Sequence, residues 1–330
     1  MSSWLTFLQA QTVQPELSEQ NSLSGLEHLG IIRVSGADAR SFLQGQFSSD
    51  IQQLSADQTQ ISSYCNPKGR MLAIMRIVPA QDDLLLVLPK TVLPVIQKRL
   101  QLYILRAEVR LQDESDTLAI MELAGPSVAA VLPAVPEQDS AQKQEGALHI
   151  LRLSGDRPRY QLIGPMAEVQ SYWQQAVQQH IIPTEACAWR LLDIRAGLPM
   201  LYPETVEAFV PQMTNLELVG GVSFQKGCYT GQEVVARMHY LGKQKRRMYR
   251  VQIAPGAEVV IGQAVYATDA REQAVGTFID VAPLGAAGGY EALVVCQINS
   301  IENHSLSLHP GGQAGPAIQR LSLPYAYPAA

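Results

Sequence analysis

The chain has 330 residues, a formal charge of −5, 47% hydrophobic residues and 17% charged residues. This composition excludes a wholly disordered chain, a collagen and a coiled coil, and the length favours two or three domains. No apolar run approaches the ~18 residues of a membrane-spanning helix. Four scattered cysteines without a CxxC pair fit free thiols in a reducing compartment, so we expect a cytoplasmic protein.

The first two thirds of the chain mix strands with helices in an irregular order. Asn66-Pro67-Lys68-Gly69 is strong turn chemistry, because proline presets φ and glycine permits a positive φ. We expect a short N-terminal helix at 3–10, strands at 29–34 and 84–88, a hairpin of 59–65 with 70–78, and helices from 35 to Gly45 and over 92–105. We read 133–146 as a loop. This order predicts an α+β fold rather than a regular βαβ array.

The spacing of apolar residues changes near residue 247, and the helical period is lost from there on. Short alternating runs at 249–253, 264–268, 276–281, 291–298 and 305–308 are separated by glycine-rich and polar turns. Such spacing is typical of a small antiparallel barrel or sandwich. We therefore predict two domains, an α+β module over 1–242 and a C-terminal β-barrel over 243–330.

The segment around Cys228 carries the most chemical information. Thr230 and Glu233 have the spacing of a helix capping box, and apolar residues follow at helical spacing. A helix is therefore expected to begin at about Gly231, which places Cys228 beside its N-terminus. The exposed N–H groups and the dipole at that end favour a thiolate.

Neighbouring residues affect this cysteine in both directions. Lys226 and Arg237 add positive charge, and Gly227 and Gly231 allow close approach of a ligand to the backbone. Glu233 opposes a thiolate if its carboxylate turns inward. From spacing alone, a buried cysteine that packs a turn is the stronger reading, since free cysteine usually behaves as a small hydrophobe.

A basic stretch follows the predicted helix. It contains Lys243, Lys245, Arg246, Arg247 and Arg250 within eight residues of an acidic chain. Such a cluster attracts anions, such as phosphate groups or a tail of several carboxylates. A solvated linker before the barrel is an equally good interpretation.

Several motifs together resemble the YgfZ family of bacterial tRNA-modifying, folate-binding proteins, which is related to the glycine-cleavage T-protein, an aminomethyltransferase. The main one is Lys226-Gly-Cys-Tyr-Thr-Gly-Gln-Glu233. The others, in the family's order, are Gly36-Ala-Asp38, Leu43-Gln-Gly-Gln46, Cys65-Asn-Pro-Lys-Gly-Arg-Met71, Ala196-Gly-Leu-Pro199, Pro211-Gln-Met-Thr-Asn215 and Leu323-Pro-Tyr325. The resemblance covers nearly the whole chain.

The resemblance implies two α+β subdomains and a C-terminal barrel around a central site for tetrahydrofolate or a derivative. Trp189 matches one of the two tryptophans that contact folate in the family, and Leu29 stands at the position of the other. An indole stacks on a pterin, whereas leucine offers only apolar contact. Without the resemblance, Trp189 reads as a core aromatic on an amphipathic helix.

The resemblance also implies a role for Cys228, where the related aminomethyltransferases carry an acidic residue. An acid pairs with a cationic amine or pterin, whereas a thiol does so only when ionised, so the substitution suggests that folate binding is kept and aminomethyl transfer is not. The family is linked instead to maintenance of iron–sulfur enzymes, including those that thiolate tRNA. One thiolate cannot hold a cluster, so Cys228 would act transiently with iron–sulfur assembly proteins or client enzymes. The residues that shape its environment would be Lys226, Gly227, Tyr229, Gly231, Gln232, Glu233 and Arg237.

Two other readings stay open at this stage. The first is a tetrahydrofolate-dependent aminomethyltransferase, the only enzymatic activity that the sequence suggests. The second is direct binding of tRNA, for which the low aromatic content of 6% gives little support. The sequence predicts neither a metal site nor a membrane partner.

Overall fold

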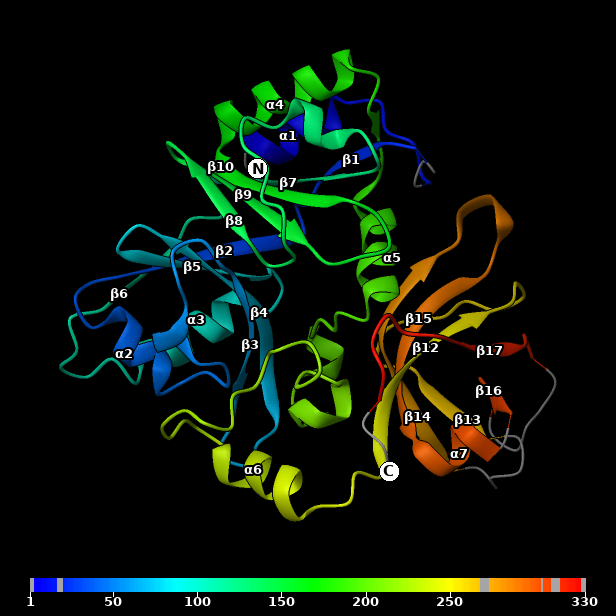
Figure 1. The fold of residues 1–330 in the computed structure, drawn as a ribbon. Coiled ribbons are helices and arrows are strands. Elements are labelled where there is room, and N and C mark those ends of the chain that lie inside the picture. Colours follow the sequence, from blue (N-terminus) through cyan, green and yellow to red (C-terminus); the bar gives the residue numbers. More distant parts are fainter. Residues whose placement is uncertain (1–2, 17–19, 268–272, 304, 310–314, 328–330) are drawn as a thin grey trace. The chain divides into compact units, whose positions relative to one another are not determined.

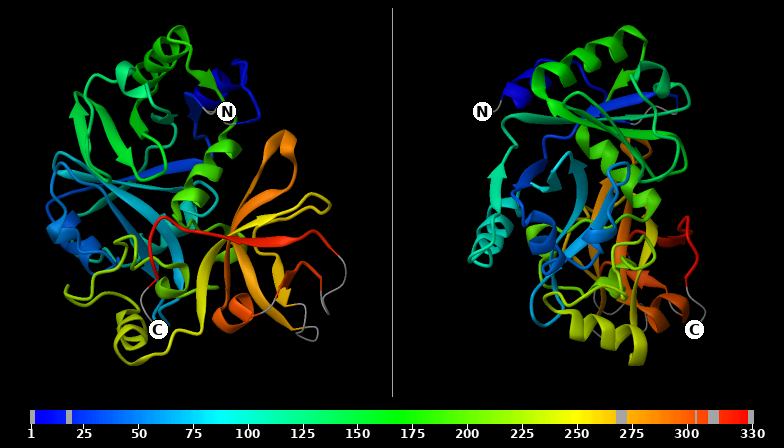
Figure 2. Two further views of the ribbon diagram at one scale, coloured as in Figure 1. Left: turned by 45° about the vertical axis from the view of Figure 1, so that its right-hand side comes forward. Right: turned by 60° about the vertical axis from the view of Figure 1, so that its left-hand side comes forward.

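The computed structural model describes residues 3–16, 20–267, 273–303, 305–309 and 315–327. The chain forms two compact units. Unit 1 comprises residues 1–45, 50–61 and 75–189, and unit 2 comprises 46–49, 62–74 and 190–330. Figure 1 and Figure 2 show the elements of both units, and each unit is described by itself below.

One sheet, most of which belongs to unit 1, has the strand order β3-β4-β5-β2-β6. Its residues 62–65 and 71–74 belong to unit 2. Its strands are β2 (Leu29–Ser35), β3 (Gln60–Cys65), β4 (Met71–Ala80), β5 (Asp83–Pro89) and β6 (Arg110–Asp113). Residues 84–89 of β5 are all buried, so both faces of this strand are covered and its continuous apolar run needs no alternation. Two helices accompany these strands, α2 (Ala39–Gln44) and α3 (Leu93–Gln101).

The second sheet of unit 1 has the order β11-β1-β7-β10-β9-β8. Its strands are β1 (Ser22–Gly25), β7 (Leu118–Ala124), β8 (Gln142–Glu145), β9 (Leu148–Leu153), β10 (Arg159–Pro165) and β11 (Ile182–Pro183). Helix α4 (Met166–Gln178) packs on β7 and β10. Its Trp173 is buried with Trp4 of α1 (Ser3–Gln9) in an apolar core, the two indoles meeting edge to face.

Unit 2 contains a closed, antiparallel six-stranded barrel of order β12-β15-β14-β13-β16-β17. Its strands are β12 (Arg246–Ile253), β13 (Ala264–Ala267), β14 (Ala274–Pro283), β15 (Tyr290–Gln297), β16 (Leu306–Ser307) and β17 (Ile318–Leu321). Alternate residues of each strand fill the interior, among them Val251, Phe278 and Val294. Closure leaves the barrel with no unpaired sheet edge.

Between the last sheet strand, β11, and the barrel, the chain forms α5 (Ala186–Ala196), the 3-10 turns η3 (Pro203–Thr205) and η4 (Pro211–Thr214), and α6 (Gln232–Leu241). Three further 3-10 turns lie elsewhere: η1 (Ile51–Gln53) before β3, η2 (Val128–Val131) after β7 and η5 (Gly285–Ala287) between β14 and β15. The first four residues of α5 belong to unit 1 and the rest to unit 2. No helix among the described residues is both long and apolar enough to traverse a bilayer.

The α+β class and the C-terminal barrel are confirmed. Three local expectations were wrong: β8 occupies part of the predicted loop at 133–146, α3 ends at Gln101 rather than 105, and helix α7 (Ile298–Asn303) interrupts the barrel strands. The strand β17 was not expected, and Thr268 of the predicted strand 264–268 lies outside the described residues. The domain boundary at residue 242 stays a prediction.

A buried carboxyl in unit 2 gives the fold a pH dependence. Burial raises the pKa of Asp280 on β14 to about 7, against the opposing effects of Arg190 and the Val281 N–H, and Asp193 raises it further. Arg190 Nε lies 3.3 Å from Asp280 Oδ1, and its guanidinium covers the Tyr202 ring at 4.8 Å. The proton on Asp280 is therefore part of the folded state at mildly acidic pH.

We expect Asp280→Asn to gain stability relative to wild type as the pH rises from about 4 to 7. A raised folded-state pKa means that the folded protein binds more protons than the unfolded chain in this window, so this group lowers the unfolding free energy as pH rises. Asparagine removes that contribution. Urea unfolding at both ends of the window checks this. Asp82→Asn, at an exposed site, is the control, and a variant with the wild-type pH slope contradicts the assignment.

Candidate functional site

The loop that carries Cys228 lies in unit 2 between Gly221 and α6, and its residues differ in burial. Lys226 and Tyr229 are buried, whereas Gly227 and Cys228 between them are exposed. The Lys226 ammonium lies 5.1 Å from the centroid of the Tyr229 ring, so the two buried side chains contact each other beneath the exposed pair. The loop thus presents the Cys228 thiol to solvent on two anchors.

Lys226 is the stronger anchor. Its Nζ donates to the carbonyl oxygens of Phe47 at 2.6 Å and Ser49 at 2.8 Å, and both residues belong to the same unit. Charge-assisted bonds of this length are among the strongest in proteins. The ammonium is therefore bound by backbone carbonyl groups of residues 46–49 and does not lie in solvent beside the thiol.

A second link joins the same backbone segment to the start of the loop. Ser48 Oγ lies 2.6 Å from the Gly221 carbonyl and 2.8 Å from Ser63 Oγ, and Ser223 N donates to the Ser48 carbonyl at 2.8 Å. Ser63 Oγ in turn lies 3.7 Å from the Cys65 sulfur. This buried hydroxyl chain holds residues 221–226 against β3 residues of the same unit.

The phenol of Tyr229 is buried without a hydrogen-bond partner for its oxygen. Burial raises the pKa of this phenol well above its usual range, and the nearby Cys65 adds to the rise. Burial also raises the pKa of the Cys65 thiol to about 12. Both groups are therefore neutral at physiological pH and serve packing.

Helix α6 begins one residue after the expected position, but the predicted capping box was wrong. Its N-cap is Gly231 at φ 84°, with no side-chain cap bond, and Glu233 instead pairs with Arg237 at 2.8 Å. Gln232 Nε2 reaches the Gly227 carbonyl at 3.5 Å. The two cations that the sequence placed near the thiol, Lys226 and Arg237, thus have other partners.

The reason for the glycine cap lies in the turn at residues 66–69. A Cβ on Gly231 would lie 2.4 Å from the Asn66 carbonyl oxygen, and a Cβ on Gly69 would lie 2.9 Å from Val234 Cβ. Asn66 fixes this turn by accepting the N–H groups of Lys68 and Arg70 on its side-chain oxygen. The turn at residues 66–69 and the start of α6 are therefore in close backbone contact, which Gly69 and Gly231 allow because they lack a side chain.

The four cysteines differ sharply in accessibility. Cys65 and Cys296 are buried, and burial raises the pKa of Cys296 to about 11. Cys187 is half-buried and its sulfur lies 3.4 Å from Glu185 Oε2, whereas Cys228 is exposed. Within the described part of the chain, no group of three His, Cys, Asp or Glu side chains is arranged to hold a metal ion.

The two proposed folate contacts both lie in unit 1. Trp189 is 1% exposed, and its Nε1 donates to Thr184 Oγ1 at 3.1 Å, which in turn bonds to the Leu23 carbonyl. Leu29, also buried, begins β2 opposite Pro89. The indole therefore has a structural partner of its own, and its contact with a folate stays a prediction.

The three candidates for an anionic tail have different surroundings. Lys245 is exposed, while Arg246 and Arg247 begin β12 and are half-buried. The Arg247 guanidinium stacks over the Tyr327 ring at 4.6 Å. Lys245 is thus the most accessible cation of the three.

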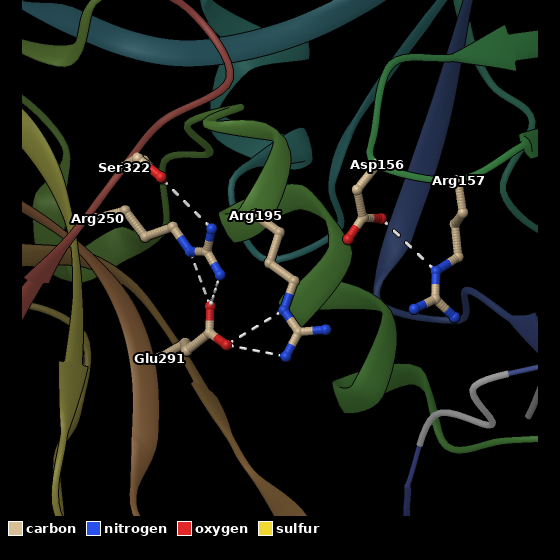
Figure 3. A network of polar contacts seen from close by, with 6 residues as sticks. All are labelled: Asp156, Arg157, Arg195, Arg250, Glu291 and Ser322. Atoms are coloured by element: carbon tan, nitrogen blue, oxygen red, sulfur yellow. Dashed lines mark hydrogen bonds and ion pairs between the residues drawn. The ribbon is translucent and has the colours of Figure 1, made fainter.

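Sequence reasoning missed a buried ionic network in unit 2 (Figure 3). The Glu291 carboxylate on β15 accepts from Arg195 of α5 at 2.8 Å and from Arg250 of β12 at 2.6 Å, so two guanidinium groups share one carboxylate. Figure 3 also draws Asp156 and Arg157 of unit 1, which pair with each other at 3.5 Å. The Glu291 network leaves a net positive charge, and no local signal in the sequence links its members.

The fold is that of an aminomethyltransferase. The glycine cleavage system aminomethyltransferase T from Bartonella henselae superposes with a TM-score of 0.74 over 92% of this chain and 86% of that chain, at 15% identity. Residues 14–153 match the GCVT N-terminal domain family. The low identity restricts the structural likeness to the fold.

Curated sequences give closer relatives, each named tRNA-modifying protein YgfZ. The protein from Edwardsiella ictaluri is 30% identical over 72% of this chain and 73% of its own length. The proteins from Colwellia psychrerythraea and Photorhabdus laumondii are 31% and 32% identical, over 71% and 69% of this chain and 73% and 70% of their own lengths. In each comparison the alignment covers more than two thirds of this chain and of its relative, so the chain belongs to the YgfZ family of tRNA-modifying proteins.

Proposed function

We propose that this protein binds a reduced folate and supports iron–sulfur enzymes that modify tRNA, with Cys228 as its functional thiol. The observation that carries the proposal is the exposed Cys228 on a loop fixed by the buried Lys226 and Tyr229. An exposed thiol makes little contribution to packing, yet the loop holds it in a fixed position through two buried side chains, which is the arrangement of a functional group. Membership of the YgfZ family supplies the link to tRNA modification.

The proposed folate is tetrahydrofolate or a derivative of it. The aminomethyltransferase fold and the GCVT domain match support a folate-related ligand. Trp189 and Leu29 are the proposed pterin contacts, and Lys245, Arg246 and Arg247 are the proposed partners of an anionic tail. Lys245 is exposed and suits a flexible polyglutamate, which needs accessible charge rather than a rigid pocket.

The proposed chemistry at Cys228 is transient. Because no described group of three candidate ligands is arranged around a metal, this thiol would meet iron or sulfur species only with a partner, either an iron–sulfur assembly protein or a client enzyme. Gly227 offers no steric obstacle beside the thiol, since a Cβ at that position would meet nothing within 4 Å. An incoming partner would therefore have open access to this part of the loop.

Folate binding is tested by tryptophan fluorescence. We expect titration with tetrahydrofolate to change the emission of the wild-type protein and to have little effect on Trp189→Phe. Trp4 and Trp173 are both buried in the core of unit 1 and serve as the internal reference. An unchanged response in Trp189→Phe would remove this residue from the folate site, and no response in either protein would remove the folate itself.

The alternative function is tetrahydrofolate-dependent aminomethyl transfer, for which the fold likeness is the supporting observation. Incubation with an aminomethylated carrier protein and tetrahydrofolate distinguishes the two. Formation of methylene-tetrahydrofolate would assign the transferase activity. Its absence, together with folate binding, fits the role proposed here.

A further inference from the structure

The C-terminal end of α6 carries an exposed aromatic and basic surface, of which the proposed function uses only Lys245. We call it the Tyr240 surface. It consists of Phe224, His239, Tyr240, Leu241, Lys243 and Lys245, all in unit 2.

Three rings of this surface are stacked on one another. The Phe224 and His239 rings lie face to face with centroids 3.7 Å apart, and Tyr240 meets both edge-on, at 6.0 Å and 4.8 Å. His239 Nδ1 lies 3.2 Å from Glu217 Oε2, which further fixes the imidazole. The rings are therefore held in place before any ligand arrives, which reduces the entropy cost of binding.

The outermost members of the surface are far from buried. Tyr240 is 64% exposed and Leu241 is 85% exposed. Two neighbouring apolar side chains this accessible leave part of the surface without a packing partner, and such patches can serve as contact sites. The free face of the Tyr240 ring is a platform on which a planar group can stack.

Two exposed lysines follow the platform. Gln244 between them is turned inward, since its Nε2 donates to the Gln212 carbonyl at 2.6 Å and the Arg246 carbonyl at 3.0 Å. Lys243 and Lys245 on either side are exposed. The pinned glutamine thus fixes the spacing of two solvent-facing cations.

The charge of this region identifies the kind of ligand. Residues 217–250 contain seven Lys and Arg residues against two Glu, giving +5 in a chain whose total is −5. Both Glu residues are occupied, Glu217 with His239 and Glu233 with Arg237. Stacking rings beside unopposed cations are the combination by which proteins hold single-stranded nucleic acid, whereas an apolar protein partner would not require the lysines.

We propose that the Tyr240 surface binds single-stranded RNA. One base stacks on Tyr240, and the adjacent phosphates contact Lys243 and Lys245. The choice of RNA over DNA rests on the tRNA-related function proposed above, and the recognition of a single strand rests on the exposed ring, because a base inside a duplex has no free face to offer.

The test is fluorescence anisotropy of the full-length protein with a labelled single-stranded RNA and with unmodified tRNA. Tyr240→Ala is expected to weaken binding about tenfold or more, since stacking of one base contributes ~1–3 kcal/mol, while Tyr240→Phe retains binding. Lys243→Ala/Lys245→Ala is expected to lower the slope of log affinity against log salt by about 1.4, or about 0.7 for each phosphate contact. Tyr103→Ala and Lys98→Ala, at exposed sites in unit 1, are the matched controls.

The outcomes separate this inference from the proposed function. Wild-type affinity in Tyr240→Ala, an unchanged salt slope in the double lysine variant, or equal binding of a duplex would overturn the RNA surface. Cys228→Ser is expected to bind RNA like the wild type. A protein that binds RNA through Tyr240 but neither binds folate nor needs Cys228 would refute the proposed function and leave this surface standing.

Discussion

Replacement of Cys228 by serine is expected to leave the protein folded and to abolish its support of tRNA thiomethylation. Serine differs from cysteine by one atom, and at an exposed position such a change alters the unfolding free energy by less than about 0.5 kcal/mol. It removes the only sulfur atom of this loop, and with it the ability to form a thiolate, a disulfide or a metal–sulfur bond. The measurement is thiomethylated tRNA in a cell that lacks the native protein and expresses the variant.

The control for this experiment is Cys187→Ser. Cys187 is half-buried and its sulfur lies 3.4 Å from Glu185 Oε2, so its replacement also changes a thiol but outside the Cys228 loop. Full restoration of tRNA thiomethylation is expected with this variant. Equal restoration by Cys228→Ser would show that the thiol has no function, and the family's role in tRNA modification would then have to depend on other residues.

The parts of the fold that the sequence predicted well are those set by local chemistry. The turn at Asn66–Gly69 formed as expected because proline, glycine and the Asn66 side chain all act within four residues. Helix α2 ends at Gln44 with Gly45 as its C-cap, as expected, although it begins at Ala39 rather than at 35. Strands β2 and β5 end within one residue of their predicted limits, because turns bound their apolar runs.

The parts that were missed depend on contacts between distant residues. Thr230 and Glu233 have the spacing of a capping box, but Gly231 caps α6 because the backbone of Asn66 occupies the space where a Cβ would stand. The contact spans more than 160 positions of the chain, so no window of the sequence reveals it. The shared carboxylate of Glu291 was hidden for the same reason, since Arg195 comes from a helix 96 residues away.

The candidate site shows the same division. The sequence predicted that Cys228 stands next to a helix N-terminus, and α6 begins four residues after it. It also suggested that Lys226 places its charge beside the thiol, but the ammonium is buried on carbonyl groups almost 180 residues away in the chain. A lysine in a polar motif gives no local indication that its amine is inside the protein.

Lys226→Met is accordingly expected to destabilise unit 2 and to release the Cys228 loop. Methionine fills much of the volume of the lysine stem but leaves the carbonyl oxygens of Phe47 and Ser49 without this donor, and an unsatisfied buried polar group costs ~1–3 kcal/mol. We expect a loss of about 3 kcal/mol in the unfolding free energy. Faster amide hydrogen exchange is expected in residues 223–231.

Urea unfolding and hydrogen exchange measure these two effects on the full-length protein. Lys98→Met on the exposed surface of α3 is the matched control and is expected to change the unfolding free energy by less than about 0.5 kcal/mol. If the Lys226 variant unfolded like this control and its loop exchanged at the wild-type rate, the ammonium would not be an anchor. The exposed thiol would then sit on a loop held by Tyr229 and Ser48 alone, and the case for a position-dependent role of Cys228 would lose its structural basis.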